Sequence, residues 1–407
     1  MLTQEKNELL THVGPGTPMG DLLRRYWHPV GPLQDLTDDH PTKYVRILGE
    51  DLVLFKDKSG RVGLIQYHCM HRGASLEFGR VEERGISCAY HGWLYDVDGN
   101  CLEQPCEPAD SKFYQSIKAT AYPVQQLLGL HWAYLGPQPA PVIPHYEPFV
   151  RKDLRHWLVL GPQVDANWLQ VLENGVDPYH SAILHQDSRG KGPLPNTTRG
   201  NVDFIDRIEC FLTSYGIMKR QYYKNGGWYR QHPMIFPNML ALERVVQISV
   251  PIDDTHTARY RIAFAEREEN DPEDGEELPV TYQAPHKSPA DAQAPFAKYE
   301  MLGETEAQDY MVFETQGPIA NRTIERLATS DRWVIQLREM YADNIAVVQD
   351  GGDPFGVIRD PGHEMIALEM GSESQHRYDR DPMSRVYAGD PLQRTIKGST
   401  PTGQALE

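Results

Sequence analysis

The sequence has no long hydrophobic run and is short of positive charge. No apolar stretch approaches the roughly 20 residues that cross a bilayer as a helix, and no basic segment followed by an apolar one opens the chain. We therefore expect a cytoplasmic protein with no membrane partner. Lysine and arginine number 40 against 57 aspartate and glutamate residues, a net charge of −17. Because nucleic acid is bound by basic surfaces that neutralise its phosphates, this balance argues against DNA or RNA as a partner.

Cysteine is also scarce. The chain has five cysteines, and a small, odd number in a sequence of this length does not suggest a disulfide framework. Some of them are better interpreted as thiolate ligands of a metal. No Gly-x-Gly-x-x-Gly follows a strand-like segment, so the sequence signature of a dinucleotide site is missing. Any nicotinamide or flavin that the chemistry needs would then be carried by another protein.

The 407 residues are enough for two domains, each with its own core. The first residues predict short helices, because Thr17-Pro18 has the pattern of a cap followed by a first helical proline. From Tyr44 to about Gly136 the sequence has short β-prone runs separated by turns, and a proline-rich linker follows. We therefore expect N-terminal helices that pack on the catalytic domain, a β domain, the catalytic domain and a tail, with boundaries at 1–35, 36–145, 146–350 and 351–407.

The second domain has mixed periodicity. The patterns predict both helices and strands in it. The expected helices are 167–173, 306–316 and 331–349, and the expected strands are 204–212, 239–250 and 256–265. Residues 266–277 hold eight acidic side chains, which we interpret as a solvated surface loop.

Two short Cys/His pairs stand sixteen residues apart, Cys69-x-His71 and Cys88-x-x-His91. A zinc finger has both cysteines before both histidines, so the alternating order fits zinc poorly. In a Rieske [2Fe–2S] centre two histidines replace two cysteines on one iron. Cys69 and Cys88 would then hold one iron, and His71 and His91 the other. The remaining alternatives are a zinc site and buried side chains without a metal. The other cysteines are expected to be unliganded: Cys101, Cys106 and Cys210.

A second polar cluster contains His180 and His185. A regular helix would place side chains five residues apart about 140° from each other, so the two rings converge only if the helix is distorted or ends between them. Asp177-Pro178 has the pattern of an N-cap and a first helical residue. Two histidines and one carboxylate form the facial triad of non-haem Fe(II). Spacing alone does not identify the carboxylate among the candidates Glu306, Asp309, Glu314, Asp331 and Asp343.

These motifs resemble those of Rieske non-haem iron oxygenases. Residues 69–76 and 88–93 are similar to the two cluster-binding loops, although Met70 stands where the family usually has proline. Asp-x-x-His-x-x-x-x-His at 177–185 resembles the mononuclear iron motif, and 308–319 resembles a C-terminal segment of phthalate-dioxygenase-like members. The resemblance extends from about Leu2 to Arg338. It implies an α+β protein in which an N-terminal all-β Rieske domain precedes a helix-grip catalytic domain, an antiparallel sheet around a long helix.

The resemblance also implies residue roles. His180, His185 and Asp309 are the expected ligands of the mononuclear iron. Asp177 is not a ligand in this family, and it connects the first iron histidine, here His180, with a cluster histidine of the neighbouring subunit, here His91. The expected catalytic residues outside the ligand set are Asn174 and Asp177.

The implied reaction is oxidation of a small aromatic substrate with O₂. Electrons from NAD(P)H arrive through a reductase with flavin and usually another iron–sulfur centre, and the oxygenase is a homotrimer or a multiple of one. The subgroup favours hydroxylation or O-demethylation of an aromatic acid. The alternatives are cis-dihydroxylation of a neutral aromatic or other small organic substrate, and electron carriage without catalysis. The candidate clamps for an anionic substrate are Arg189, Lys191, Arg199, Lys219 and Arg220.

Overall fold

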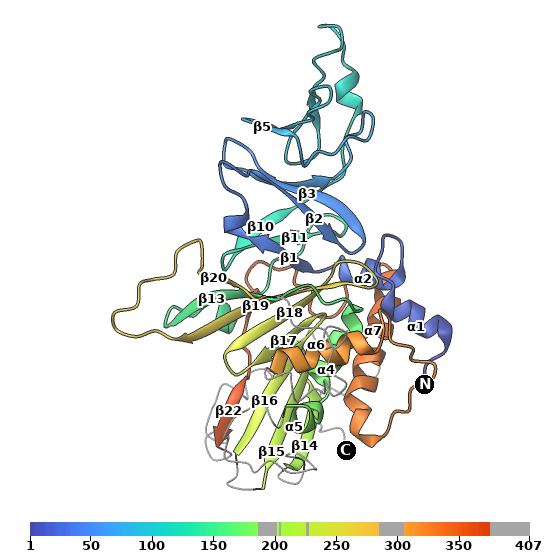
Figure 1. Ribbon diagram of the computed structural model, residues 1–407, viewed down its shortest axis with the longest axis vertical. Coiled ribbons are helices and arrows are strands. Elements are labelled where there is room, and N and C mark those ends of the chain that lie inside the picture. The colour runs from blue at the N-terminus through green and yellow to red at the C-terminus, as the bar shows by residue number, and fades with distance from the viewer. Residues whose placement is uncertain (186–201, 203–204, 225–227, 285–304, 375–407) are drawn as a thin grey trace, which may run out of the picture. The chain divides into compact units, whose positions relative to one another are not determined.

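The computed structural model describes residues 1–185, 202, 205–224, 228–284 and 305–374 (Figure 1). The chain divides into two compact units. The smaller unit is Arg24–Pro141 with Asp274–Pro279, and the larger one contains Met1–Leu23, Val142–Glu273 and the chain from Val280 onwards. Among the helices of the described part, none has the length and apolarity needed to span a membrane.

The smaller unit is built from three antiparallel sheets. The first has the order β1 (Trp27–Pro32), β11 (Leu130–Tyr134) and β10 (Val124–Leu127). The second has the order β2 (Thr42–Ile47), β3 (Glu50–Lys56), β4 (Val62–Gln66) and β9 (Ala121–Tyr122). The third has the order β5 (Arg80–Glu82), β6 (Gly85–Ser87), β7 (Leu94–Tyr95) and β8 (Cys101–Glu103). Two 3₁₀ turns complete the unit, Leu33–Asp35 and Phe113–Ser116.

One hydrophobic core joins the second and third sheets. Val53, Phe55, Ile65 and Ile86 are fully buried in it. The cysteines of both Cys/His pairs belong to the same core. The two loops that carry the pairs therefore start from rigid, well-packed positions.

The sequence boundary at residue 36 differs from the structure. Helices α1 (Gln4–Thr11) and α2 (Pro18–Leu23) form as expected, but the helical pattern does not continue through Trp27. Residues Trp27–Pro32 are instead strand β1, which pairs with β11 with a register shift between Pro29 and Gly31. Proline and glycine both disfavour a helix interior, and the fully buried strand supplies the apolar contacts.

A nine-stranded sheet dominates the larger unit. Its order is β14 (Ile205–Leu212), β15 (Gly216–Tyr223), β16 (Trp228–Ile235), β17 (Met239–Leu242), β18 (Val245–Pro251), β19 (Thr257–Glu266), β13 (Leu154–Leu160) and β20 (Val280–Tyr282), with β22 (Gly371–Ser374) beside β16. All pairs are antiparallel except β13 with β20. A separate parallel pair is β12 (His145–Tyr146) and β21 (Met365–Ile366).

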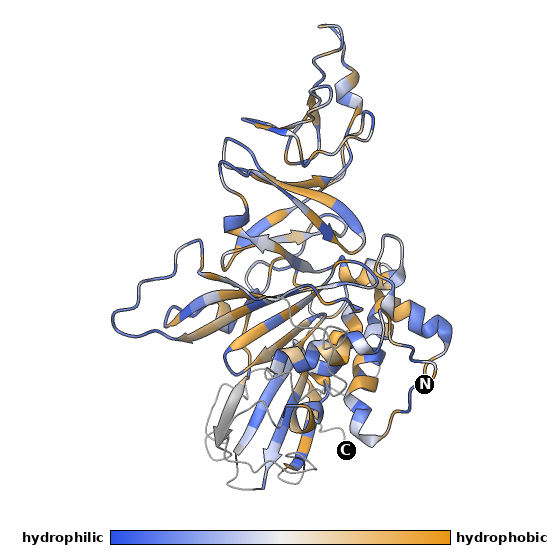
Figure 2. Cartoon of the chain, in the orientation of Figure 1, coloured by the Kyte–Doolittle hydropathy of each residue, from blue (hydrophilic) through white to orange (hydrophobic). Residues whose placement is uncertain are grey.

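The larger unit contains further helices besides α1 and α2. They are α3 (Glu147–Val150), α4 (Trp168–Val176), α5 (His180–Ile183), α6 (Thr305–Thr315) and α7 (Arg332–Gln349), with a 3₁₀ turn at Thr329–Asp331. Helix α4 contacts β17 and β18 on one side and α6 and α7 on the other (Figure 1). Apolar and polar residues alternate along α7 (Figure 2), and its buried side chains recur at helical spacing from Trp333 to Val348. The expected helix-grip architecture is therefore confirmed.

Three further sequence expectations can be compared with these elements. The strand expected at 239–250 is two strands, β17 and β18, joined by the tight turn Glu243-Arg244. The segment expected as a tail from 351 contributes β21 and β22 to the larger unit. The acidic loop is largely exposed from Glu268 to Glu277, in agreement with the interpretation as a solvated loop.

Candidate metal centres and substrate cavity

The two Cys/His loops of the smaller unit have the same turn geometry. In each loop a glycine amide donates to the carbonyl of the cysteine four residues earlier, Gly73 to Cys69 and Gly92 to Cys88, both at 2.9 Å. Both glycines have a φ of 74°. This left-handed conformation disfavours residues with a Cβ. The chain therefore turns tightly after each Cys/His pair.

The four side chains of these loops divide into a buried and a more exposed set. Cys69 and Cys88 are buried, whereas His71 is exposed and His91 is partly exposed. The two imidazole ring centroids are 4.6 Å apart, and Trp93 stacks on His71 at the same distance. The Nδ1 atom of His91 is buried and has no hydrogen-bond partner in the described part of the chain. Two thiols, two neighbouring imidazoles and an unsatisfied ring nitrogen fit a Rieske cluster.

All five cysteines are free thiols in the structure. Cys101 and Cys210 are buried and Cys106 is exposed. Burial raises the pKa of Cys101 to about 11, so this thiol stays protonated at neutral pH.

His180 and His185 follow the junction between helices α4 and α5. The sequence assigned Asp177 to the N-cap of this helix, and that assignment is wrong. Asp177 is the C-cap of α4, with its amide donating to Glu173, and Tyr179 is the N-cap of α5. The carboxylate of Asp177 accepts the Tyr179 amide at 2.8 Å, which closes the turn between the helices. Because α5 is a single turn that ends before His185, the two histidines are not on one regular helix.

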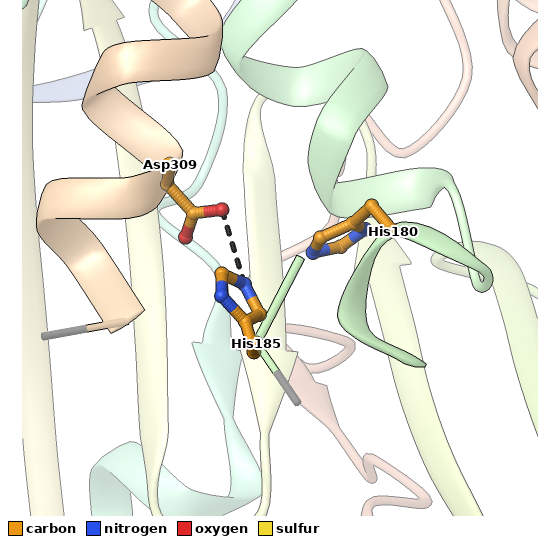
Figure 3. A group of neighbouring side chains, drawn as sticks. All are labelled: His180, His185 and Asp309. Atoms are coloured by element: carbon orange, nitrogen blue, oxygen red, sulfur yellow. Dashed lines mark ion pairs between the residues drawn. The ribbon is translucent and has the colours of Figure 1, made fainter. Parts of the chain in front are cut away.

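His180 and His185 converge with Asp309 from α6 (Figure 3). One ligand atom from each of the three side chains lies within 4.8 Å of the others. His185 Nε2 and Asp309 Oδ1 are 3.2 Å apart, and the two imidazole centroids are 5.3 Å apart. Within the described ranges, this is the one such group of three His, Cys, Asp or Glu side chains. The other carboxylate candidates are not part of it.

The outer nitrogen of each histidine has an acceptor. His185 Nδ1 lies 2.9 Å from Gln308 Oε1, and His180 Nδ1 lies 2.7 Å from the backbone oxygen of Asp177. Such contacts fix the tautomer and direct Nε2 towards a metal. The His180 ring therefore contacts Asp177 at its backbone carbonyl. Sequence reasoning missed Gln308, although its position next to Asp309 on α6 was a usable signal.

The charges of the three side chains suit a cation. Burial lowers the pKa of His180 to about 4, so its ring is neutral at pH 7. Burial alone would raise the pKa of Asp309, but contact with the His185 ring lowers it below its ordinary value. Asn174 donates to Asp309 Oδ1 at 3.4 Å and helps to orient this carboxylate. Neutral imidazoles and an ionised carboxylate are the states that bind divalent metals.

A cavity of about 520 Å³ opens beside this group. It is lined by His180, His185 and Asp309 themselves and by apolar side chains of the sheet and helices. The apolar wall includes Val159, Leu172, Leu240, Leu242 and Phe313. Its size and mixed lining are typical of sites for small organic molecules.

The candidate clamps have different positions. Lys219 lines the cavity and donates to the carbonyl of Gly175 at 2.8 Å. Arg220 is not among the lining residues and instead contacts Gln231 and Glu369. The other three lie outside the described residues: Arg189, Lys191 and Arg199. Sequence reasoning missed four lining arginines: Arg230, Arg244, Arg259 and Arg261.

Comparison with known proteins shows what the N-terminal domain and the chain as a whole are similar to. The family model for the Rieske [2Fe-2S] domain matches residues 26–123. The 5,5'-dehydrodivanillate O-demethylase oxygenase subunit of Sphingobium sp. is 36% identical over 89% of this chain and 84% of its own length. The phenoxybenzoate dioxygenase subunit alpha of Ectopseudomonas oleovorans is 36% identical over 89% and 90%. The phthalate 4,5-dioxygenase oxygenase subunit of Pseudomonas putida is 34% identical over 88% and 89%.

Solved structures share the fold. The QL mutant of Pseudomonas putida CBB5 NdmA with caffeine has a TM-score of 0.61 at 22% identity, covering 82% of this chain and 94% of that one. The reduced complex between oxygenase and ferredoxin in carbazole 1,9a-dioxygenase has a TM-score of 0.56 at 17% identity, covering 83% and 93%. At these identities the likeness concerns the fold alone.

Proposed function

The chain belongs to the family of Rieske oxygenase subunits, and from that premise we propose that it oxidises a small aromatic acid with O₂ at a mononuclear iron. It is an oxidoreductase with a Rieske [2Fe–2S] domain. The observation that carries the proposal is the convergence of His180, His185 and Asp309 beside a cavity of about 520 Å³.

We assign the cluster ligands to Cys69, Cys88, His71 and His91. The shared turn geometry of the two loops and the unsatisfied His91 nitrogen support this assignment. We assign the iron ligands to His180, His185 and Asp309. When bound, a cluster of this kind supplies electrons one at a time, and Fe(II) with open positions brings O₂ and substrate together.

The residues around the iron ligands have separate tasks in this proposal. Asn174 orients the Asp309 carboxylate, and Gln308 orients the His185 ring. Asp177 holds His180 through its carbonyl, and its carboxylate is the bridge to the cluster histidine of a neighbouring chain. The apolar wall of the cavity excludes water and receives the aromatic ring.

Relatives support an aromatic acid as substrate. The names of three of them specify dehydrodivanillate, phenoxybenzoate and phthalate. They also include both a demethylase and dioxygenases, so we propose hydroxylation or O-demethylation without choosing between them. One observation favours the neutral-substrate alternative: a relative of 36% identity is a tert-butanol monooxygenase / tert-amyl alcohol desaturase oxygenase subunit.

Further parts of the proposal concern partners and location. We propose that a reductase delivers electrons from NAD(P)H, that the oxygenase is a homotrimer or a multiple of one, and that it works in the cytoplasm. Five free cysteines agree with a reducing compartment. A ferredoxin complex is known for the carbazole 1,9a-dioxygenase oxygenase.

The test combines iron analysis with turnover. The iron-loaded protein, an electron-donating reductase and NADH are incubated under ¹⁸O₂ with phthalate, 3-chlorobenzoate, a methoxybenzoate and neutral aromatics. We expect about three iron atoms per chain and labelled product, or demethylated product with formaldehyde, from at least one acid. About two iron atoms per chain without oxidation of any substrate would instead mean an electron carrier.

A further inference from the structure

Strand β19 presents two arginines to the cavity. Side chains alternate between the faces of a strand, so Arg259 and Arg261 point to the same side as Ala263, and all three line the cavity. Their cross-strand neighbours on β18 are Ser249 and Gln247, which line it too. The arginines are only 7% and 8% exposed. They are therefore built into the cavity wall and do not extend into solvent.

Several contacts fix the guanidinium group of Arg259, but they do not use all of its hydrogen-bond donors. Its Nη2 donates to Gln247 Oε1 at 2.5 Å. The guanidinium carbon lies 5.6 Å from the ring centre of Tyr310 and 5.7 Å from that of Phe313. These aromatic faces hold the planar group by cation–π contact. The Nε atom is buried without a hydrogen-bond partner in the described part of the chain.

Arg261 resembles Arg259 in its hydrogen bonding. Its guanidinium forms an ion pair with Glu306 of α6 and donates to Gln283. Its Nε atom is also buried and lacks a partner among the described residues. Two adjacent guanidinium groups of the cavity wall thus each have a buried Nε donor without an acceptor among the described residues. A buried donor without an acceptor is costly, and native structures generally provide a partner.

The acidic side chains of the cavity do not balance the two arginines. Three acidic residues line it in the described structure. Glu243 faces Arg230 at 3.3 Å, and Asp309 belongs to the metal-binding group. Glu306 remains as the one carboxylate for both Arg259 and Arg261. Two buried cations with one buried anion leave room for a second anion.

We propose that Arg259 and Arg261 bind the carboxylate of an aromatic acid substrate. This inference rests on the proposed function and names the residues that select the substrate. A carboxylate has two oxygens and accepts from planar guanidinium groups at short distance, which suits two guanidinium groups that lie on one face of β19 in the cavity wall. The ring of the acid then occupies the space between the arginines and His180, against Phe313. A neutral analogue of the same shape would leave both arginines without the second anion.

Binding of matched pairs tests the proposal. The probes are 3-chlorobenzoate and phthalate, each compared with its carboxamide, titrated calorimetrically into the iron-loaded oligomer without O₂. We expect the wild type to bind each acid at least about tenfold more tightly than its amide. Equal affinities in the unmodified protein, or binding of the amides alone, would overturn the proposal without any variant.

The variants are Arg259→Gln and Arg261→Gln. Each should weaken binding of the acids by about tenfold or more and leave binding of the amides unchanged. The control is Arg155→Gln on the neighbouring strand β13, whose side chain is 49% exposed and faces Asp271, and which should change neither affinity. Retention of about three iron atoms per chain shows that each variant has folded around both metal sites. Arg259→Lys and Arg261→Lys keep the charge and should restore part of the preference for the acids.

The outcomes separate this proposal from the proposed function. If the acids bind through the two arginines but none is oxidised, the clamp stands and the oxygenase activity on these acids fails. If the acids are oxidised and the arginine variants lose acid and amide affinity equally, the activity stands and the clamp is wrong. If the oligomer binds no acid, the assignment of the cavity to anionic substrates is wrong.

Discussion

A phenol hydroxyl lies against one of the proposed cluster cysteines. Tyr95 Oη is 3.3 Å from Cys69 Sγ, and both side chains are buried. A metal-bound thiolate has no proton, so the phenol is then the donor. Hydrogen bonds to the sulfurs are among the factors that set the reduction potential of a cluster, because they stabilise the more negative, reduced state.

Tyr95→Phe should therefore lower the reduction potential of the cluster and leave its ligands in place. The potential is measured by a mediated titration followed by electron paramagnetic resonance. Tyr90→Phe is the matched control, because Tyr90 is exposed in the loop of Cys88 and His91 and its hydroxyl contacts Arg72 and not a sulfur, so the potential should not change. An unchanged potential in Tyr95→Phe would contradict the role of this hydrogen bond.

Asp309 is the residue on which the iron assignment depends most. Asp309→Ala should reduce the iron content from about three to about two atoms per chain, keep the Rieske spectrum and abolish turnover. Glu314→Ala, also on α6, is the control and should keep all the iron, because Glu314 is not in the metal-binding group. Loss of iron in Glu314→Ala but not in Asp309→Ala would reverse the assignment.

Sequence spacing groups site residues most easily when they lie close together in the chain. The cluster pairs could be recognised from spacing, because each pair is confined to a short segment. The spacing of His180 and His185 alone was weak evidence, and it gained weight only beside the Rieske motif. Asp309 could not be recognised from spacing, because a different helix brings it to the histidines, and only family resemblance selected it. Arg259 and Arg261 are two residues apart, a spacing that all residues on one face of a strand share. It does not show which face is buried, and only the folded sheet does. The basic residues chosen for their position after the iron motif therefore missed them.

At the scale of elements, a buried ion network joins α4 to α7. Glu173 accepts from Arg322 at 2.8 Å and from Arg338 at 2.6 Å. Burial would raise the pKa of Glu173, but the two arginines outweigh it and the pKa is lowered. Removal of the Glu173 charge leaves buried Arg322 without its carboxylate partner, whereas Arg338 keeps Glu325. The network also holds the end of α4, from which the chain turns to His180.

Glu173→Gln should destabilise the folded protein by about 3 kcal/mol at pH 7. A carboxyl with a lowered pKa contributes its full stability above the unfolded value of about 4.5 and loses it as the pH falls through the folded value. The difference in melting temperature between wild type and variant should therefore shrink below about pH 4.5. Glu339→Gln, exposed on α7, is the control. Equal melting temperatures at pH 7 would show that the network contributes no stability.

The elements predicted from sequence were right where periodicity was long and wrong at junctions. Helices α6 and α7 and strands β14 and β19 agree with the expected segments. The turn Glu243-Arg244 was missed because two charged residues without glycine or proline do not interrupt a β-prone run. The break between α4 and α5 was misread because Asp177-Pro178 fits a helix start, whereas here Asp177 ends one helix and turns the chain towards the next. That break is what allows the two histidines to converge.

At the scale of the whole molecule, the chain contributes one proposed cluster and one proposed iron, in two compact units. We propose that Asp177 connects the iron of one subunit with the cluster of its neighbour, as the family resemblance implies. Asp177 remains partly exposed, with one carboxylate oxygen on the Tyr179 amide. We therefore expect electrons to pass between chains of a ring, and Asp177→Asn should keep all the iron and lose most of the turnover.

Complementation between two inactive variants tests this route. His71→Ala should disable only the cluster and His180→Ala only the iron, so each homo-oligomer should be inactive. In a head-to-tail ring every subunit has one donor face and one acceptor face, and about a quarter of the junctions in a random equal mixture join an intact cluster to an intact iron. Co-expression should thus restore roughly a quarter of the wild-type activity. Transfer within one chain predicts none, because no chain in the mixture has both centres. Mixed oligomers that demonstrably form and stay inactive would exclude the route between chains.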